Sequence, residues 1–175
     1  MIQSYLNDLK KMNSQILTKI NNFTKNRLLE FLGITLVLVS IFLLLSIVTY
    51  SPSDPNFIYT PENVDIKNLG GFYGSVSSDF LLQSIGLISF LVVLNLLNWG
   101  FSLITDKKIT KFIPKVFYTL VYIIFGTTFI NILLNNSFWL IDNGNGGFIG
   151  RIIKENFYFF TTLIESQYAV FSFLL

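Results

Sequence analysis

The sequence predicts an all-α polytopic membrane helical bundle with three complete spans, an interfacial helix and a truncated fourth span. Three observations predict this fold. Long apolar stretches without any charge recur along the chain, and only 13% of the residues are charged, against about a quarter in soluble domains. The third observation is that lysines gather beside these stretches mainly on one side. Since about 20 apolar residues cross a bilayer as a helix, membrane lipid is the first expected partner.

Residues 1–27 are expected to form a cytoplasmic basic amphipathic arm. Its apolar residues recur at steps of three or four, which places them on one face of a helix. They are Ile2, Leu6, Leu9, Met12, Ile16, Ile20 and Phe23. Two interpretations stay open: a helix that is solvated or lies on the membrane surface, and a helix that docks against a protein. A cleaved signal peptide is not expected, because both the basic region and the apolar stretch are too long.

Residues 28–175 are expected to form the membrane-anchoring domain, built from spans joined by loops of contrasting composition. The first span carries no charge and is ended by Pro52 and Pro55, which have no N–H to donate to a helix. A turn-rich loop with four acids fills 51–79, and a short lysine-rich loop fills 105–115. The three complete spans are expected at about 31–50, 80–104 and 116–134.

The last part of the chain is expected to begin with a helix in the membrane interface. A second turn-rich loop, 135–147, precedes it. From about 148 to 164 the apolar residues fall on one face and the charged residues lie off it, as in a helix that lies on a membrane. Arg151 and Glu155 are one helical turn apart and are expected to pair. An apolar run at about 166–175 is too short to cross, so we expect it to be the start of a fourth span.

The distribution of basic residues predicts the orientation. Nine lysine and arginine residues lie in segments 1–30 and 105–115, and three lie in segments 51–79 and 135–165. The side richer in these residues is normally cytoplasmic. The N-terminus and the lysine-rich loop are therefore expected inside, and the two turn-rich loops outside.

The composition excludes most catalytic chemistry. Histidine and cysteine are absent from the sequence, so imidazole bases, thiol nucleophiles and thiolate metal sites are excluded. No Walker-type phosphate loop occurs, and the three spans contain no Asp or Glu, which disfavours ion-coupled carriers. We expect no catalytic, cofactor-binding or metal-binding residue in this chain. The polar side chains within the expected spans are read as interhelical hydrogen-bonding groups or, alternatively, as the lining of a solute path: Gln83, Asn95, Asn98 and Asn131.

A short glycine motif occurs twice, at an offset of 76 residues. It reads GGFYG at 70–74 and GGFIG at 146–150. Each copy follows an outward-going span and an Asn-containing loop, so the chain reads either as two hairpins of the same hand or as a chain with two ordinary glycine turns. Two repeated hairpins also support an alternative function, a small transporter or channel subunit.

Several motifs follow one another in a fixed order. The motif TYSPSDP comes directly after the first span, NLGGFYG follows in the first loop, Asp79 opens the expected second span, and GGFIG precedes the final helical stretch. In this order they resemble the N-terminal four-span region of the FtsK/SpoIIIE family of DNA translocases, over about residues 28–175. The residues that carry the resemblance are Ser51, Pro52, Asp54, Pro55, Asn68, Gly70, Gly71, Gly74, Asp79, Gly146, Gly147 and Gly150.

The resemblance implies a role that the residues alone do not. In that family this region anchors a motor to the bacterial inner membrane at the septum, for chromosome segregation and cell division. The implied partners are division-site proteins and sister copies, which form a hexamer in full-length members. Double-stranded DNA, ATP and magnesium are implied only for the motor and C-terminal domains, none of which is in this sequence.

Overall fold

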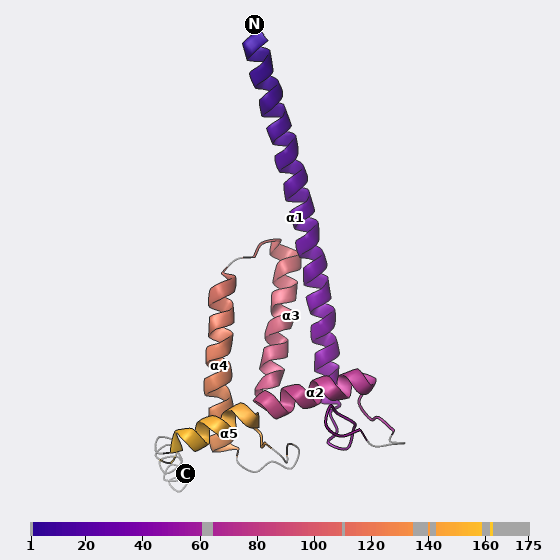
Figure 1. Ribbon diagram of the computed structural model, residues 1–175, viewed down its shortest axis with the longest axis vertical. Coiled ribbons are helices and arrows are strands. Elements are labelled where there is room, and N and C mark those ends of the chain that lie inside the picture. The colour runs from indigo at the N-terminus through magenta and orange to yellow at the C-terminus, as the bar shows by residue number, and fades with distance from the viewer. Residues whose placement is uncertain are drawn as a thin grey trace.

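The computed structural model describes residues 2–60, 65–109, 111–134, 140, 143–158 and 162. Over these residues the chain is all-helical, without a strand. Three helices, α1, α3 and α4, are long and apolar enough to cross a membrane. Figure 1 shows them upright, with α2 and α5 lying across their lower ends. The helices are α1 (Ile2–Val48), α2 (Gly71–Ile85), α3 (Ile88–Asp106), α4 (Phe112–Leu133) and α5 (Gly147–Asn156). An all-α fold with three candidate spans is thus confirmed.

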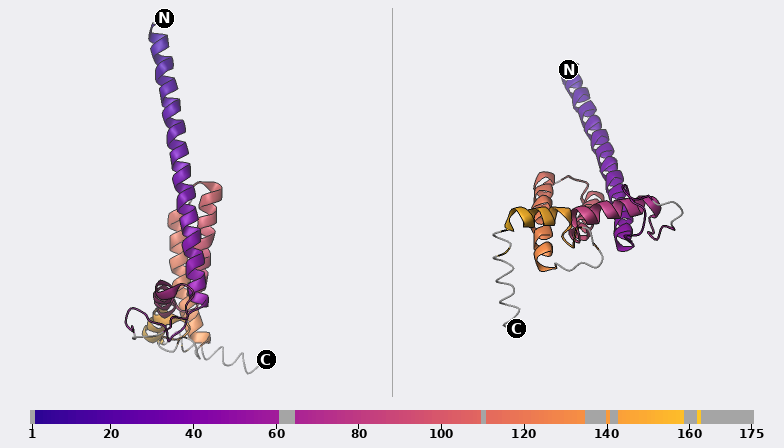
Figure 2. Two further views of the ribbon diagram at one scale, coloured as in Figure 1. Left: turned by 90° about the vertical axis from the view of Figure 1, so that its right-hand side faces the viewer. Right: turned by 60° about the horizontal axis from the view of Figure 1, so that its bottom comes forward.

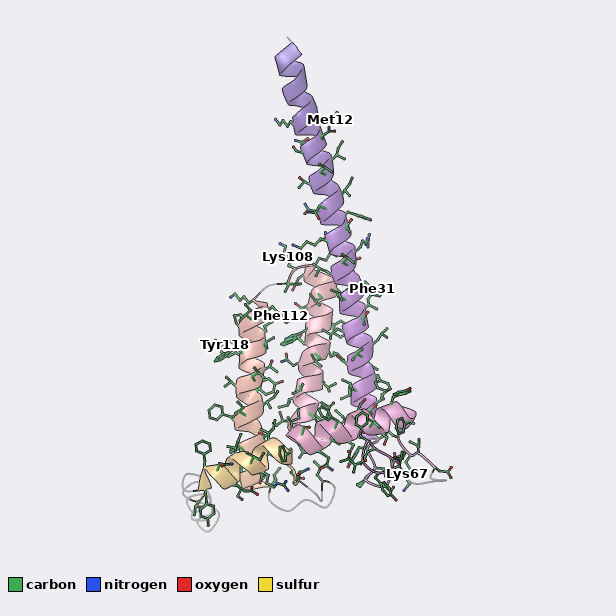
Figure 3. The ribbon with its side chains drawn as sticks, viewed as in Figure 1. Met12, Phe31, Lys67, Lys108, Phe112 and Tyr118 are labelled. Atoms are coloured by element: carbon green, nitrogen blue, oxygen red, sulfur yellow. The ribbon has the colours of Figure 1, made fainter. Side chains whose placement is uncertain are left out.

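The basic arm and the first span form one uninterrupted helix. Helix α1 contains 47 residues, and at 1.5 Å per residue it is about 70 Å long. Its N-terminal half, which includes Met12, extends beyond all the other helices (Figure 3). Of the apolar side chains predicted on one face of the arm, Met12, Ile16, Ile20 and Phe23 are 47–62% exposed. The arm is therefore a continuation of the span and not a separate element.

The second span was expected at 80–104, but the structure breaks this stretch into two helices. Residues 71–85 form α2, which turns at Gly86 and Leu87, and the apolar helix long enough to cross begins only at Ile88. Gly86 has a φ of +59°, and its backbone lies against the carbonyl group of Asn145. Leu87 N–H also donates to that Asn145 oxygen, at 2.9 Å. The turn is therefore fixed by a contact with the second loop, and residues 71–79, expected in a loop, are helical.

Helices α1 and α3 pack closely because both present small residues where they meet. A Cβ atom at Gly33 would lie 2.8 Å from the carbonyl oxygen of Gly100, and one at Gly100 would lie 2.7 Å from the Val37 side chain. The side chain of Ser40 is also fully buried. Without a hydrophobic driving force between helices in lipid, such close backbone approach supplies the packing energy.

Helix α4 agrees with the third expected span, 116–134, to within a few residues. It packs mainly on α5 and also contacts α3, where Asn95 Nδ2 donates a hydrogen bond to Thr119 Oγ1 at 2.9 Å. That bond confirms an interhelical role for Asn95. Helix α5 begins where the interfacial helix of 148–164 was expected, and its Arg151–Glu155 pair is present, at 4.0 Å. The start of a fourth span at 166–175 lies outside the described residues.

Candidate functional site

The candidate site is the junction between the end of α1, the first loop and α2, which we call the first corner. Asp54, from the SPSDP turn, is only 2% exposed. Its Oδ1 accepts the N–H of Lys67 at 3.1 Å, and its Oδ2 accepts the N–H of Asn68 at 2.8 Å. Carboxylates form stronger hydrogen bonds than neutral acceptors. Asp54 therefore fixes the return of the loop to the end of α1.

Asn68 caps the C-terminus of α1 from outside that helix. The last carbonyl groups of a helix have no partner within it. Asn68, 4% exposed, donates from Nδ2 to the carbonyl oxygen of Ser46 at 2.8 Å and to that of Thr49 at 3.4 Å. Its Oδ1 accepts the N–H of Gly70 at 2.9 Å. One buried amide thus joins the end of α1 to the start of α2.

Glycine allows α2 to lie directly on α1 at this corner. Gly70 precedes the helix, and Gly71 opens it with a φ of +61°, in space where a side chain would meet nothing. At position 71 glycine is therefore required by the positive φ of the backbone and not by lack of space. At Gly74 the reason is proximity, because a Cβ atom would lie 2.9 Å from Ser46 Oγ and would also overlap the Asn68 amide oxygen.

The second corner, where α4 meets α5, repeats this arrangement. Gly146 and Gly147 have φ values of −87° and +65°, against −81° and +61° for Gly70 and Gly71. Gly150 takes the place of Gly74, and its Cβ atom would lie 2.5 Å from the carbonyl oxygen of Thr127 on α4. An asparagine again reaches the end of the preceding span: Asn145 Nδ2 donates to the Leu134 carbonyl at 3.0 Å. The two corners therefore share a backbone conformation.

A row of polar side chains connects the corners. Tyr50, at the end of α1, donates from its hydroxyl group to Asp79 Oδ1 at 3.1 Å. Gln83 Nε2 donates to the same hydroxyl oxygen at 3.4 Å, and Asn143 Nδ2 donates to Gln83 Oε1 at 2.8 Å. Figure 2 shows α2 and α5 following one another across the lower ends of the spans. The row and this alignment make α2 and α5 one continuous layer, which we call the platform.

At the opposite ends of the spans, α1 is tied to the α3–α4 loop by an ion pair. Lys107 Nζ and Arg27 Nη1 each lie 2.5 Å from a carboxylate oxygen of Glu30, just before the uncharged part of α1. Lys107 first, and then Arg27, hold the pKa of that carboxyl below its ordinary value of 4.5. Lys108 and Phe112 lie at this lysine end, whereas Lys67 lies at the other (Figure 3).

Comparison with known protein families gives one decisive match. Residues 25–164, most of the chain, match the model of the 4TM region of DNA translocase FtsK/SpoIIIE. The chain belongs to this family. Among relatives, it is 36% identical over 92 residues to the DNA translocase FtsK of Vibrio vulnificus, and 30% identical over 135 residues to that of Rickettsia prowazekii. It is 21% identical over 136 residues to that of Mesorhizobium japonicum.

The match to these FtsK proteins covers much of this chain and little of theirs. It spans 51%, 77% and 78% of the chain in the three cases, but only 9%, 16% and 15% of the relatives' own lengths. No solved structure matches the chain. The chain is therefore the membrane segment of an FtsK/SpoIIIE protein, and the catalytic motor is not in it.

The structure brings most of the motif residues of the FtsK/SpoIIIE resemblance into the two corners. Pro55 is buried and its carbonyl accepts the Ser75 hydroxyl, whereas Pro52 is exposed. The Ser51 hydroxyl oxygen lies 2.9 Å from that of Ser53, and the Ser51 carbonyl accepts the N–H of Asp54 at 3.1 Å. Asp79 does not open the second span, because it lies in the middle of α2. The turn at Gly86 and Leu87 separates it from α3.

Sequence reasoning missed the partners that these motifs contact. Ser46, Ser75 and Ser78 are buried at the first corner, and Ser78 Oγ accepts from Asn68 Nδ2 at 3.3 Å. Their only signal in the sequence is that they are small and polar within helices. Gln83, expected at membrane depth, instead lies in α2 and bridges Tyr50 to Asn143.

Proposed function

We propose that this chain anchors a DNA translocase to the bacterial inner membrane at the division septum, with its N-terminus in the cytoplasm. The single observation that carries the proposal is the match of residues 25–164 to the 4TM region of DNA translocase FtsK/SpoIIIE. The relatives from Vibrio vulnificus, Rickettsia prowazekii and Mesorhizobium japonicum are each a DNA translocase FtsK. The orientation rests on the nine basic residues of segments 1–30 and 105–115, against three in the other two segments.

The proposed mechanism is positional. The spans hold the anchor in the bilayer, and the hydrogen-bonded corners keep the interfacial platform at a fixed angle to α1. ATP, magnesium and double-stranded DNA are handled by motor and DNA-reading domains outside this chain. Sister copies associate through the anchors, as subunits of a hexamer.

We propose that the first loop contacts division-site proteins. Phe57, Ile58 and Tyr59 are 78%, 97% and 54% exposed there, on the side of the molecule opposite the lysine end. An exposed apolar cluster of this kind is typical of a protein interaction site. Buried Asp54 and Asn68 fix the base of the same loop.

A domain replacement in the complete gene tests the proposal. We expect a fluorescent fusion of the full protein to form a band at the septum, and the band to disappear when residues 28–175 are exchanged for an unrelated multi-span anchor. A band that persists after the exchange would contradict a septal role for this region. An open reading frame without an ATPase motif would contradict the translocase assignment.

The paired corners favour a second candidate, a transporter or channel subunit of two repeated hairpins. Solute flux in vesicles that carry residues 1–175 alone would support it. The anchoring proposal predicts that such vesicles leak no more than empty ones.

A further inference from the structure

An apolar groove opens between α1, α3 and α4 at the lysine end of the spans. Its volume is about 280 Å³, close to the lower end of the range for small-molecule pockets. The apolar side chains that line it come from all three spans and from the loop between α3 and α4. They are Leu32, Leu36, Trp99, Leu103, Ile109 and Phe112.

Two lysines and Ser102 complete the lining of this groove. Lys108 comes from the α3–α4 loop and Lys115 from the first turns of α4. Neither pairs with a carboxylate among the residues that the structure describes, whereas the neighbouring Lys107 is neutralised by Glu30. Asp106, the acid nearest in sequence, accepts a hydrogen bond from Ser102 at 2.9 Å. The groove therefore offers two lysines that form no ion pair with a described carboxylate, beside an apolar surface.

The position of the groove along the spans favours a lipid as its occupant. Lys108 and Phe112 lie where α3 ends and α4 begins, which is the level of the headgroups for a helix that crosses the bilayer (Figure 3). Trp99 packs edge-to-face on Phe112, with ring centroids 6.2 Å apart, and tryptophan is enriched at that level. Lysines beside a membrane attract anionic headgroups.

We propose that this groove binds one anionic phospholipid. An acyl chain lies against the apolar lining formed by Leu32, Leu36 and Leu103, and the phosphate group lies between the ammonium groups of Lys108 and Lys115. The acyl chain supplies contact area and the phosphate supplies charge recognition. Inorganic phosphate, which lacks the chain, does not occupy the site.

Quenching of Trp99 fluorescence by brominated lipids tests the proposal. The full chain with Trp139→Phe, which leaves Trp99 as its single tryptophan, is placed in phosphatidylcholine vesicles that contain a small fraction of brominated lipid. We expect brominated phosphatidylglycerol to quench Trp99 more strongly than brominated phosphatidylcholine at the same fraction. The double variant Lys108→Gln, Lys115→Gln is expected to reduce the preference on the order of tenfold.

The matched control is Lys11→Gln, Lys19→Gln, which removes the same charge from the exposed arm. We expect it to keep the wild-type preference, and millimolar inorganic phosphate to leave the quenching unchanged. Equal loss in both double variants would mean general surface attraction and would overturn the proposal, as would competition by inorganic phosphate. Absence of quenching by either lipid would mean that a protein segment fills the groove, which also overturns it.

Discussion

The side-chain amide of Asn68 donates a hydrogen bond to the main-chain carbonyl of Ser46, 2.8 Å away, so that a residue of the first loop terminates helix α1. Both groups are buried, at 4% exposure for Asn68 and 0% for Ser46. A buried carbonyl that loses its donor keeps its full desolvation cost. This side chain therefore contributes directly to the stability of the corner.

Replacement of Asn68 by alanine is expected to lower the free energy of unfolding by about 1–3 kcal/mol, because the Ser46 carbonyl and the Gly70 N–H lose their partner. Thermal unfolding in detergent micelles measures the change. Asn156→Ala is the control, since Asn156 also donates to a carbonyl, that of Ile152, but on an exposed surface. Its effect is expected within about 0.5 kcal/mol. Equal effects of the two variants would contradict the capping role.

Asp54→Ala is expected to cost about 3 kcal/mol, because two backbone N–H groups, of Lys67 and Asn68, lose a charged acceptor. Asp65→Ala removes the same group from an exposed position of the same loop and serves as control. Unfolding in denaturant, followed by circular dichroism, compares the two. If Asp54→Ala were as mild as Asp65→Ala, the loop would not be held by the carboxylate.

Gly74→Ala and Gly150→Ala are expected to destabilise the protein by a similar amount, about 1–3 kcal/mol each, because each Cβ atom would overlap the span beneath it. Ser77→Ala, on α2 and only half-buried, is the matched small substitution and is expected to change stability by less than about 0.5 kcal/mol. The melting temperatures of the three variants test whether the corners are equivalent. A harmless alanine at Gly150 alone would show that the second corner is looser than the first.

The orientation is tested by cysteine labelling. Because the sequence contains no cysteine, only the introduced residue can react with a thiol reagent. Asp54, although expected outside with Asp65, is too deeply buried to label, so Lys67→Cys and Lys108→Cys are the useful positions. An impermeant thiol reagent is expected to label position 67 in cells with a permeabilised outer membrane, and position 108 only after lysis. The reverse pattern would overturn the predicted topology.

The Glu30 ion pairs predict a pH dependence with a definite sign. Since its pKa is lowered in the folded state, the carboxylate contributes stability above its ordinary value of 4.5, and this contribution disappears as the pH falls through the lowered value. The melting temperature of Glu30→Gln is therefore expected below that of the wild type at neutral pH. The two should converge in acid. A difference that grew as the pH fell would contradict the pairing with Lys107 and Arg27.

The parts of this fold that could be predicted are those with a clear hydropathy pattern. The uncharged stretches predicted the membrane part of α1 and predicted α4, and the separation of charged from apolar residues around Arg151 predicted α5. Helix α2 was missed because half of its buried residues, Gly74, Ser75 and Ser78, are glycine or serine and give its first turns no apolar period. The turn at Gly86 was hidden within an apolar run, because what fixes it is a contact with Asn145 in the second loop.

The candidate site was predictable only in part, for a related reason. The motif residues could be named, since Asp54, Asn68 and the glycines form recognisable runs. Their partners could not, because Asn68 bonds across 22 residues to Ser46, and Gln83 across 60 to Asn143. Such pairings depend on how the corners fold and leave no periodic trace in the sequence.

The unbroken course of α1 makes it a stiff lever. The arm before Phe31 adds about 44 Å of helix to the part that enters the bilayer, with no joint between the two. A sideways force on the N-terminal end of α1 would therefore tilt the whole helix against Gly100 of α3. The tilt would strain the hydrogen bond from Asn68 to Ser46 at the C-terminal end of α1. A force applied to the N-terminal end of α1 would thus be transmitted directly to the first corner at its C-terminal end.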